Sequence, residues 1–186
     1  MAKRRRNGSL TGGTGDINPQ FYTGVVLQTA INTDVVIKFA TPKPSFSATG
    51  NKAVVMEILR IWAMTDMIPD LTAPGLINYS ATMSFSTHFA VGVPEFNDHN
   101  LFGYYQEYVH LAFTAAQGVA VVRIMKPCVL DLTDGAGHGW LLAADYFAVG
   151  LRTVATTTNN KGYFKLLYRF KKVGLAEYIG IVQSQQ

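Results

Sequence analysis

The stretch SATMSFSTHFAV, residues 80–91, alternates between apolar and polar side chains. Apolar residues stand at positions 81, 83, 85, 89 and 91, and Thr, Ser and His fill most of the positions between them. A period of two is typical of a β-strand that packs one face on a core. The same period returns in YVHLAFT (108–114) and in GYFKLLYRFKK (162–172), so the pattern predicts a β-protein.

Other runs are apolar at both parities: GVVLQTAI (24–31), VAVVRIM (119–125) and WLLAADYFAVGL (140–151). Such runs are typical of strands that pack one face on a second sheet and present the other to a neighbouring subunit. The run KAVVMEILRIWAM (52–64) is ambiguous, because Val54, Ile58 and Ile61 also have helical spacing. Its β-branched and aromatic content favours a strand.

Turn-forming clusters rich in Gly, Pro, Asn and Asp separate these runs, as in TPKP (41–44), GVPEFNDHN (92–100) and TDGAGHG (133–139). They leave eight or nine strands and no long helix. We therefore predict an all-β fold, an eight-stranded antiparallel jelly-roll sandwich spanning residues 21–186. Residues 1–20 are predicted to form a flexible arm, because they are rich in Gly, Ser and Thr and offer little apolar area to bury.

The composition of the 186-residue chain indicates self-association. Hydrophobic residues make up 48% and charged residues only 15%, against about 25% charged in an average soluble domain. A surface with so few charges is expected to be covered in part by other copies of the chain, because interface cores are depleted of charge. The single cysteine, Cys128, excludes an intrachain disulfide and is interpreted as a small buried hydrophobe. We expect no membrane span, because no segment has the required ~18 uncharged apolar residues.

Most of the net charge lies in the arm. Lys3, Arg4, Arg5 and Arg6 outweigh Asp16, so residues 1–20 carry +3 of the formal net charge of +4. A flexible cationic segment binds phosphates through counterion release and does not read sequence. We therefore predict that these four residues contact nucleic acid; a solubilising tail or a nuclear import signal are the alternatives.

A second basic group lies near the C-terminus: Lys161, Lys165, Arg169, Lys171 and Lys172. Residues 165, 169 and 171 share strand parity, so they are predicted to form one cationic stripe. Together with Lys161 they make a possible secondary basic face for nucleic acid. The alternative is an ordinary solvated sheet face.

The sequence carries no strong enzymatic signal. In LTDGAGHGW (132–140), Asp134 and His138 could act as a general acid–base pair, but the segment lacks the Gly-Lys-Ser/Thr ending of a phosphate loop. A glycine-rich connection between strands is the favoured interpretation. Two acidic pairs, Asp66 with Asp70 and Asp131 with Asp134, could bind calcium, but turn capping is favoured. We predict no catalytic residue, no metal and no cofactor, and hence a protein that is not an enzyme.

In layout the chain resembles the capsid proteins of small icosahedral viruses, and among them the compact capsid proteins of circular, Rep-encoding single-stranded DNA viruses, the circovirus-like group. Satellite-virus capsids share this plan of basic arm, glycine-rich hinge and uncharged β-body. In sequence the resemblance rests on VVMEILRIW (54–62), LTDGAGHGWLLAADYFAVGL (132–151) and KLLYRFKKVGLAEYIGIVQSQQ (165–186). It implies a jelly roll whose loops form the contacts of a closed shell, with the arm inside against the genome.

The resemblance implies a capsid protein that self-assembles into a T=1 shell of sixty copies and packages a single-stranded genome, which we expect to be DNA. Its implied partners are other copies of itself, the nucleic acid and an unidentified host receptor, with no membrane; its implied location is the virion, with the host nucleus as a site of assembly. The arm is shorter than in many circovirus-like proteins. Four cations on sixty subunits give about 240 charges, too few to neutralise one kilobase at about one charge per nucleotide. The sheet face or other cations would then contribute, or packaging would be only weakly electrostatic.

Two other functions fit the sequence less well. A jelly-roll carbohydrate- or ligand-binding module would use an aromatic and carboxylate-lined pocket. A small nucleic-acid-binding barrel would need a basic and aromatic sheet throughout, whereas residues 21–186 carry a net charge of only +1, from twelve Lys and Arg against eleven Asp and Glu.

Overall fold

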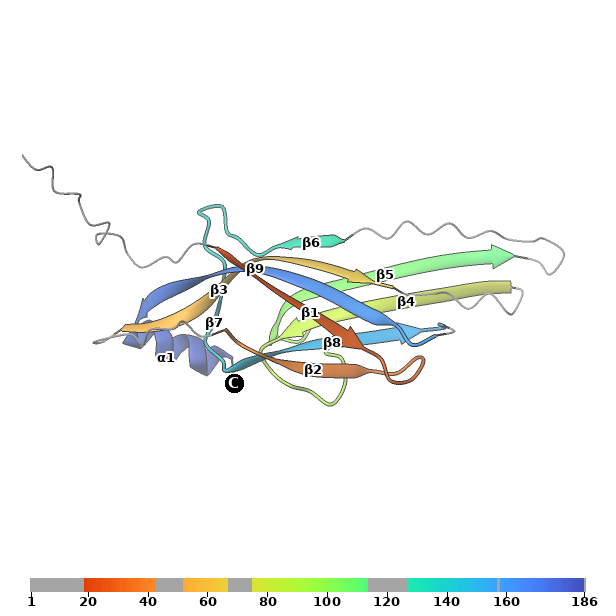
Figure 1. Ribbon diagram of the computed structural model, residues 1–186, viewed down its shortest axis with the longest axis horizontal. Coiled ribbons are helices and arrows are strands. Elements are labelled where there is room, and N and C mark those ends of the chain that lie inside the picture. Colours follow the sequence, from red (N-terminus) through yellow and green to blue (C-terminus); the bar gives the residue numbers. More distant parts are fainter. Residues whose placement is uncertain (1–18, 43–51, 67–74, 114–126, 157, 186) are drawn as a thin grey trace, which may run out of the picture.

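The computed structural model describes residues 19–42, 52–66, 75–113, 127–156 and 158–185. These residues form nine strands and one helix (Figure 1). The elements are β1 (Gln20–Leu27), β2 (Val35–Ala40), β3 (Lys52–Thr65), β4 (Gly75–Ser86), β5 (Leu101–Phe113), β6 (Cys128–Asp131), β7 (Trp140–Leu142), β8 (Tyr146–Val154), β9 (Lys161–Gly174) and α1 (Leu175–Ser184).

The strands pair into two antiparallel sheets. One has the order β1-β9-β3-β6, with β7 also paired to β3, and the other has the order β2-β8-β4-β5. β6 and β7 pair with successive parts of β3, at residues 60–63 and 56–58, so they are two pieces of one strand interrupted by the loop 132–139. We call β1-β9-β3-β6/β7 the five-stranded sheet and the other the four-stranded sheet.

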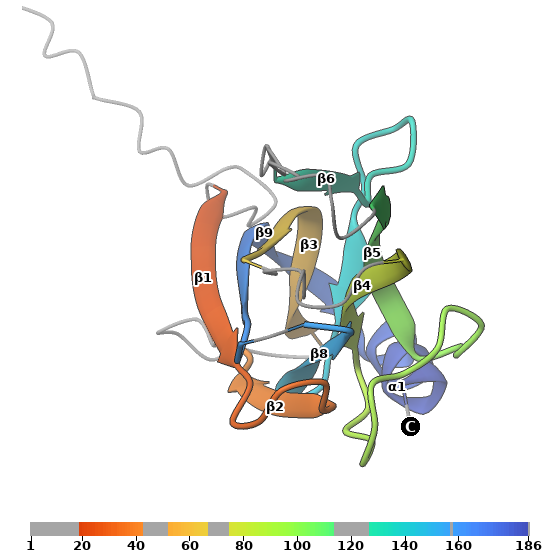
Figure 2. The same cartoon turned by 90° about the vertical axis from the view of Figure 1, so that its right-hand side faces the viewer.

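This strand order identifies the fold. When β6 and β7 are counted once, the eight strands lie in the orders first-eighth-third-sixth and second-seventh-fourth-fifth, which is the BIDG and CHEF arrangement of a jelly roll. Figure 2 shows the two sheets from the side, with β1, β9, β3 and β6 in one layer and β2, β8, β4 and β5 in the other. The predicted antiparallel jelly roll is confirmed.

The core lies between the sheets and is built from alternate residues of the central strands. Ile61 of β3, Phe85 of β4 and Phe147 of β8 are fully buried, and Phe164 of β9 is 4% exposed. Burial of each such side chain contributes about 1.5–3 kcal/mol. Gly24 of β1 is required beside this core, because a Cβ there would lie 2.3 Å from the Phe164 ring.

A buried polar network closes the end of the sandwich where the loop after β1 meets the loop after β8. The Gln28 side-chain oxygen accepts hydrogen bonds from Thr153 Oγ1 at 3.0 Å and from Asn160 Nδ2 at 3.2 Å. Asn160 Nδ2 also lies 3.0 Å from Thr156 Oγ1, and the Thr156 backbone N–H donates to Asn32 Oδ1 at 2.9 Å. The network ties together loops that lie more than a hundred residues apart in the chain.

The strand predictions are confirmed in the centre of the fold and corrected at its edges. The ambiguous run 52–64 is a strand, because its alternate residues pack on the core of the sandwich. The alternation of residues 80–91, by contrast, overestimates its strand: β4 ends at Ser86, whose hydroxyl donates to the His88 carbonyl, and Val91 is fully exposed. The run 24–31 stops being a strand at Leu27, and 140–151 is divided between β7 and β8. The run 119–125 lies outside the described residues.

The helix α1 was not expected from the sequence. Residues 175–184 have apolar side chains at helical spacing and begin at Gly174, where β9 ends. None of its residues is buried, and Leu175 and Ile179 are about half exposed. Within the described part of the chain, no helix is long and apolar enough to cross a membrane.

Candidate nucleic-acid interface

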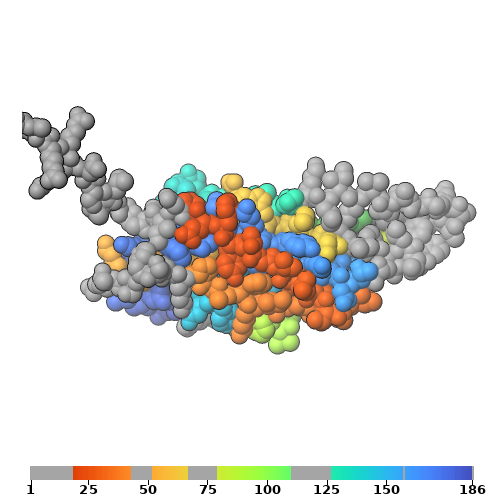
Figure 3. Space-filling model, in the orientation of Figure 1, coloured from red at the N-terminus to blue at the C-terminus, as the bar shows by residue number. Residues whose placement is uncertain are grey.

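The five-stranded sheet is the part of the body to which the predicted arm is attached. Lys3, Arg4, Arg5 and Arg6 lie outside the described residues, and the described chain joins the sheet at Gln20. Gln20 pairs with Tyr168 of β9, whose hydroxyl donates to the Gln20 side-chain oxygen at 3.0 Å. In the view of Figure 3, red-orange atoms of β1 lie beside blue atoms of β9 on the surface. The residues predicted to form the arm therefore join the described chain at the strand next to β9.

The second basic group lies on β9, and all of its members except Lys172 have the parity that faces away from the core. Phe164, Leu166 and Phe170 are buried between the sheets, while Lys161 and Lys165 of the opposite parity are exposed. Arg169 and Lys171 share that outward parity and are partly buried. The structure thus places the four predicted residues on one sheet face.

A buried carboxylate divides this group into two parts. Glu57 of β3 pairs directly with Arg169 and is fully buried. Arg169 Nε lies 2.5 Å from Glu57 Oε2, and Lys171 Nζ lies 3.5 Å from Glu57 Oε1. Arg169 and Lys171 therefore compensate Glu57, whereas Lys161 and Lys165 have no acidic partner among the residues that the structure describes.

The loop 132–139 covers Glu57. The Gly139 N–H donates to Glu57 Oε1 at 3.0 Å, and a Cβ at Gly139 would lie 2.2 Å from the Ile58 carbonyl oxygen, so only glycine allows this approach. Burial raises the pKa of Glu57, but the hydrogen bonds from Arg169 and Gly139 and the nearby positive charges outweigh it and hold the pKa below its ordinary value. Sequence reasoning missed this carboxylate; its one signal is an acidic residue inside an apolar strand.

The same loop explains the pair that resembled an acid and a base. Asp134 Oδ1 accepts the backbone N–H groups of Ala136 and His138 at 3.0 and 2.8 Å, and its Oδ2 lies 3.1 Å from His138 Nδ1. Gly137 has a φ of +84°, which favours glycine. Asp134 stabilises a tight, exposed turn, as expected for a glycine-rich connection between strands.

The acidic pairs considered for calcium are engaged elsewhere or not described. Asp131 accepts hydrogen bonds from the Thr133 hydroxyl and N–H and from Arg60 at 2.8 Å, and these lower its pKa to about 2. Asp70 lies outside the described residues, while Asp66 accepts the Lys161 backbone N–H. Within the described segments, no three His, Cys, Asp or Glu side chains are grouped as metal ligands. Cys128 is partly buried.

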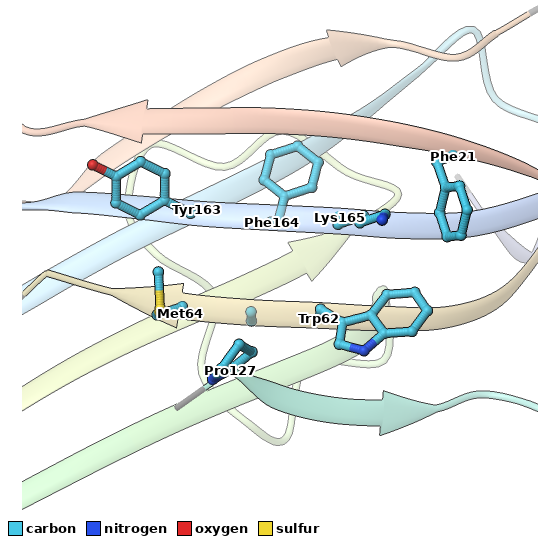
Figure 4. Close-up of a pocket in the computed structure, with 8 residues that line it drawn as sticks. Phe21, Trp62, Met64, Pro127, Tyr163, Phe164 and Lys165 are labelled. Atoms are coloured by element: carbon cyan, nitrogen blue, oxygen red, sulfur yellow. The ribbon is translucent and has the colours of Figure 1, made fainter. Parts of the chain in front are cut away.

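Lys165 lies in an aromatic pocket on the outer face of the five-stranded sheet (Figure 4). The pocket has a volume of about 450 Å³ and is lined by Phe21, Trp62, Ala63, Met64, Pro127, Tyr163, Phe164 and Lys165. Lys165 pairs with Trp62 in the sheet, and its Nζ is 3.8 Å from the Phe21 ring centroid. Sequence reasoning identified Lys165 but not these rings, because they come from β1 and β3, far away in the chain.

Comparisons with known proteins give a remote structural likeness. No protein-family model matches the chain, and no curated protein matches it in sequence. Among solved structures, VP1 of Trichodysplasia spinulosa-associated polyomavirus aligns with a TM-score of 0.49 and 11% identity, covering 84% of this chain and 96% of that one. New Jersey polyomavirus VP1 aligns with a TM-score of 0.41 and 10% identity, covering 76% and 82%. The fold assignment rests on the strand order of the chain itself.

Proposed function

We propose that this protein is a viral capsid subunit that self-assembles into a small icosahedral shell around a single-stranded genome. The observation that carries the proposal is a jelly roll whose basic N-terminal segment is attached to its five-stranded sheet at Gln20. The sequence resemblance to circovirus-like capsid proteins supports the same function and favours DNA, a shell of sixty copies and a location in the virion, with assembly in the host nucleus. We also propose that the assembled shell binds a host receptor, whose identity the sequence does not give.

Exposed apolar side chains support self-assembly. Val91 and Phe96, in the segment between β4 and β5, are 101% and 76% exposed. Leu175 and Ile179 of α1 are 52% and 47% exposed, and no residue of that helix is buried in the subunit. Individual apolar side chains are often exposed on protein surfaces, and in this proposal these are the ones that other copies bury. In the proposed shell these segments contact neighbouring copies.

Nucleic-acid binding is proposed for the arm and for part of the second basic face. Lys3 to Arg6 supply a cluster of cations that bind phosphates without reading sequence. On β9, Lys161 and Lys165 add cations on the face next to the arm's attachment, whereas Arg169 and Lys171 are committed to Glu57. The body thus adds fewer cations than the sequence count indicates.

The alternative, a jelly-roll carbohydrate- or ligand-binding module, is less well supported. Among the residues that the structure describes, the lining of the aromatic pocket has one charged side chain, Lys165, and no carboxylate or amide. A second pocket, of about 530 Å³, combines aromatic rings with the carboxylates of Asp98 and Asp131. Asp131 already accepts hydrogen bonds from Arg60 and Thr133, and Asp98 accepts one from the Asn100 N–H. Recognition of sugar hydroxyls would need these carboxylates to bind the ligand in place of those partners.

Size-exclusion chromatography with light scattering, read at 260 and 280 nm, tests the proposal. A uniform megadalton particle with a raised 260/280 ratio is expected. Reversing the charge of residues 3–6 to Glu is expected to lower the nucleic acid in the particle and leave the particle intact. A monomer or dimer of about 20–40 kDa, unchanged over salt and pH, would contradict the capsid function.

A further inference from the structure

We propose that the pocket between β1, β3 and β9 binds one unpaired nucleotide, with the base against its aromatic side chains and the phosphate near Lys165. This inference rests on the proposed function and deepens it. It assigns to the body of the subunit a defined site for a base, in addition to the non-specific charge of the arm.

The aromatic rings form the first part of the argument. Phe21 and Trp62 come from β1 and β3, the strands on either side of β9, and their rings lie close to each other beside Lys165, with centroids 6.1 Å apart and planes tilted by 57° (Figure 4). Tyr163 and Met64 continue the apolar lining along the neighbouring strands. The volume of about 450 Å³ lies within the ~300–1,000 Å³ of typical small-ligand pockets. Aromatic faces in such a site stack on any base, because every base has a π-face.

The charge of the pocket selects an anionic partner. Lys165 is the one charged residue among the described residues that line it, and its Nζ lies 3.8 Å from the Phe21 centroid and 5.9 Å from that of Trp62. The two rings hold the ammonium group at the pocket, where its N–H groups remain available to a phosphate. The nearby Arg60 is already paired with Asp131 at 2.8 Å. A flat ring joined to an anion, as in a nucleotide, matches this combination.

The position of the pocket also favours nucleic acid over a purely apolar occupant. Phe21 follows directly after Gln20, where the arm joins the sheet. Residues 7–19 span at most about 45 Å when fully extended, so a strand bound by residues 3–6 lies within reach of the pocket. An apolar protein surface that covered Phe21 and Trp62 would make no use of the Lys165 cation beside them.

Tryptophan fluorescence tests the site directly, because the chain has two tryptophans. Trp140 lies on β7 and packs on Phe102 with centroids 6.3 Å apart, away from this pocket. The variant Trp140→Phe leaves Trp62 as the single reporter. Titration with oligo(dT) is expected to quench Trp62 emission, whereas an abasic deoxyribose-phosphate oligomer of the same length is expected to bind with little quenching.

Substitutions then separate the base from the phosphate. Trp62→Leu is expected to weaken oligo(dT) binding, measured by fluorescence anisotropy, by roughly 5- to 150-fold, the range for loss of one stacked base. Lys165→Met is expected to lower the slope of log K against log salt by about 0.7, the value for one phosphate contact on a single strand. Lys38→Met is the matched control, because Lys38 also lies over two aromatic rings, Phe89 and Tyr146, but on β2 of the four-stranded sheet; it is expected to leave Trp62 quenching unchanged. Circular dichroism and thermal unfolding check that each variant folds.

Three results would overturn the site: equal quenching of Trp62 by the abasic oligomer, binding of oligo(dT) with no change at Trp62, or equal effects of Lys165→Met and Lys38→Met on the salt slope. Shielding of Trp62 from acrylamide in particles free of nucleic acid would also overturn it, because a second copy would then occupy the pocket. Light scattering on the same samples separates the two proposals. Quenching without a shell would refute the capsid function and support the site, whereas a filled shell with unchanged Trp62 would refute the site alone.

Discussion

Glu57 provides the sharpest test of how the sheet face is built. The variant Glu57→Gln keeps the shape of the side chain and an oxygen that can accept the Gly139 N–H. It removes the negative charge that faces Arg169 at 2.5 Å and Lys171 at 3.5 Å. The two cations then lie side by side next to a neutral, fully buried group.

The structure sets the expected size of the effect. Removing one partner of a buried ion pair costs about 3–5 kcal/mol, because the other charge is left uncompensated. The Arg169 and Lys171 side chains are 23% and 27% exposed, so water can hydrate them in part, and we expect the lower end, about 3 kcal/mol. For a chain of this size, each kcal/mol lowers the unfolding midpoint by about 2–4 °C. The expected loss is therefore about 6–12 °C.

Urea unfolding of the unassembled subunit, followed by fluorescence, measures the free energy of unfolding. The matched control is Glu95→Gln. It removes the ion pair between Glu95 and Arg152, and the Glu95 side chain is 65% exposed. Exposed pairs contribute at most about 1 kcal/mol. If Glu57→Gln destabilises the subunit no more than Glu95→Gln does, Glu57 does not organise this face as described. The double variant Glu57→Met with Arg169→Met is expected to regain part of the loss, because it removes the carboxylate and its nearer cation together and leaves Lys171, which is 27% exposed.

Three further predictions concern pH and packing. The folded state lowers the pKa of Glu57 below the unfolded value of about 4.3. The charge of Glu57 therefore contributes its full stabilisation above that pH and loses it as the pH falls through the folded pKa. In thermal scans, the difference in unfolding midpoint between wild type and Glu57→Gln should narrow below about pH 4. The variant Asn160→Ala should lower the free energy of unfolding in urea by about 1–3 kcal/mol, because it leaves its buried hydrogen-bond partners unsatisfied. The variant Asn159→Ala, at an exposed side chain, should lower it clearly less. Equal losses would contradict the buried network. The variant Gly24→Ala should destabilise the subunit by about 1–3 kcal/mol, because the added Cβ overpacks the core. The variant Gly180→Ala should stabilise it by up to about 1 kcal/mol, because the space around that position of α1 is open. The opposite order would refute the packing described.

Particular elements show how far the sequence leads. The run 52–64 could be assigned to a strand from β-branched and aromatic content, and the structure confirms it as β3. The same reasoning predicted that this strand continues to residue 91, because apolar and polar residues still alternate in the sequence after β4 ends at Ser86. The sequence analysis also missed α1. This helix has only ten residues and no buried face, so its apolar spacing is too short to distinguish it from the end of β9. Local pattern thus identifies strands in the core and fails where tertiary contacts decide the ends.

The sequence by itself determined the class of the fold and the place of the charge: strands of period two, a body with a net charge of +1, and a cationic segment before it. These properties depend on composition and on neighbours in the chain, so they can be read without coordinates. Only the tertiary structure decided which cations are available. It brings Glu57 opposite Arg169 across β3 and β9, and it places Phe21 and Trp62 around Lys165. Pairing of β9 with β1 and with β3, between residues about 100 to 150 apart in the chain, makes these contacts, and no local pattern contains that register.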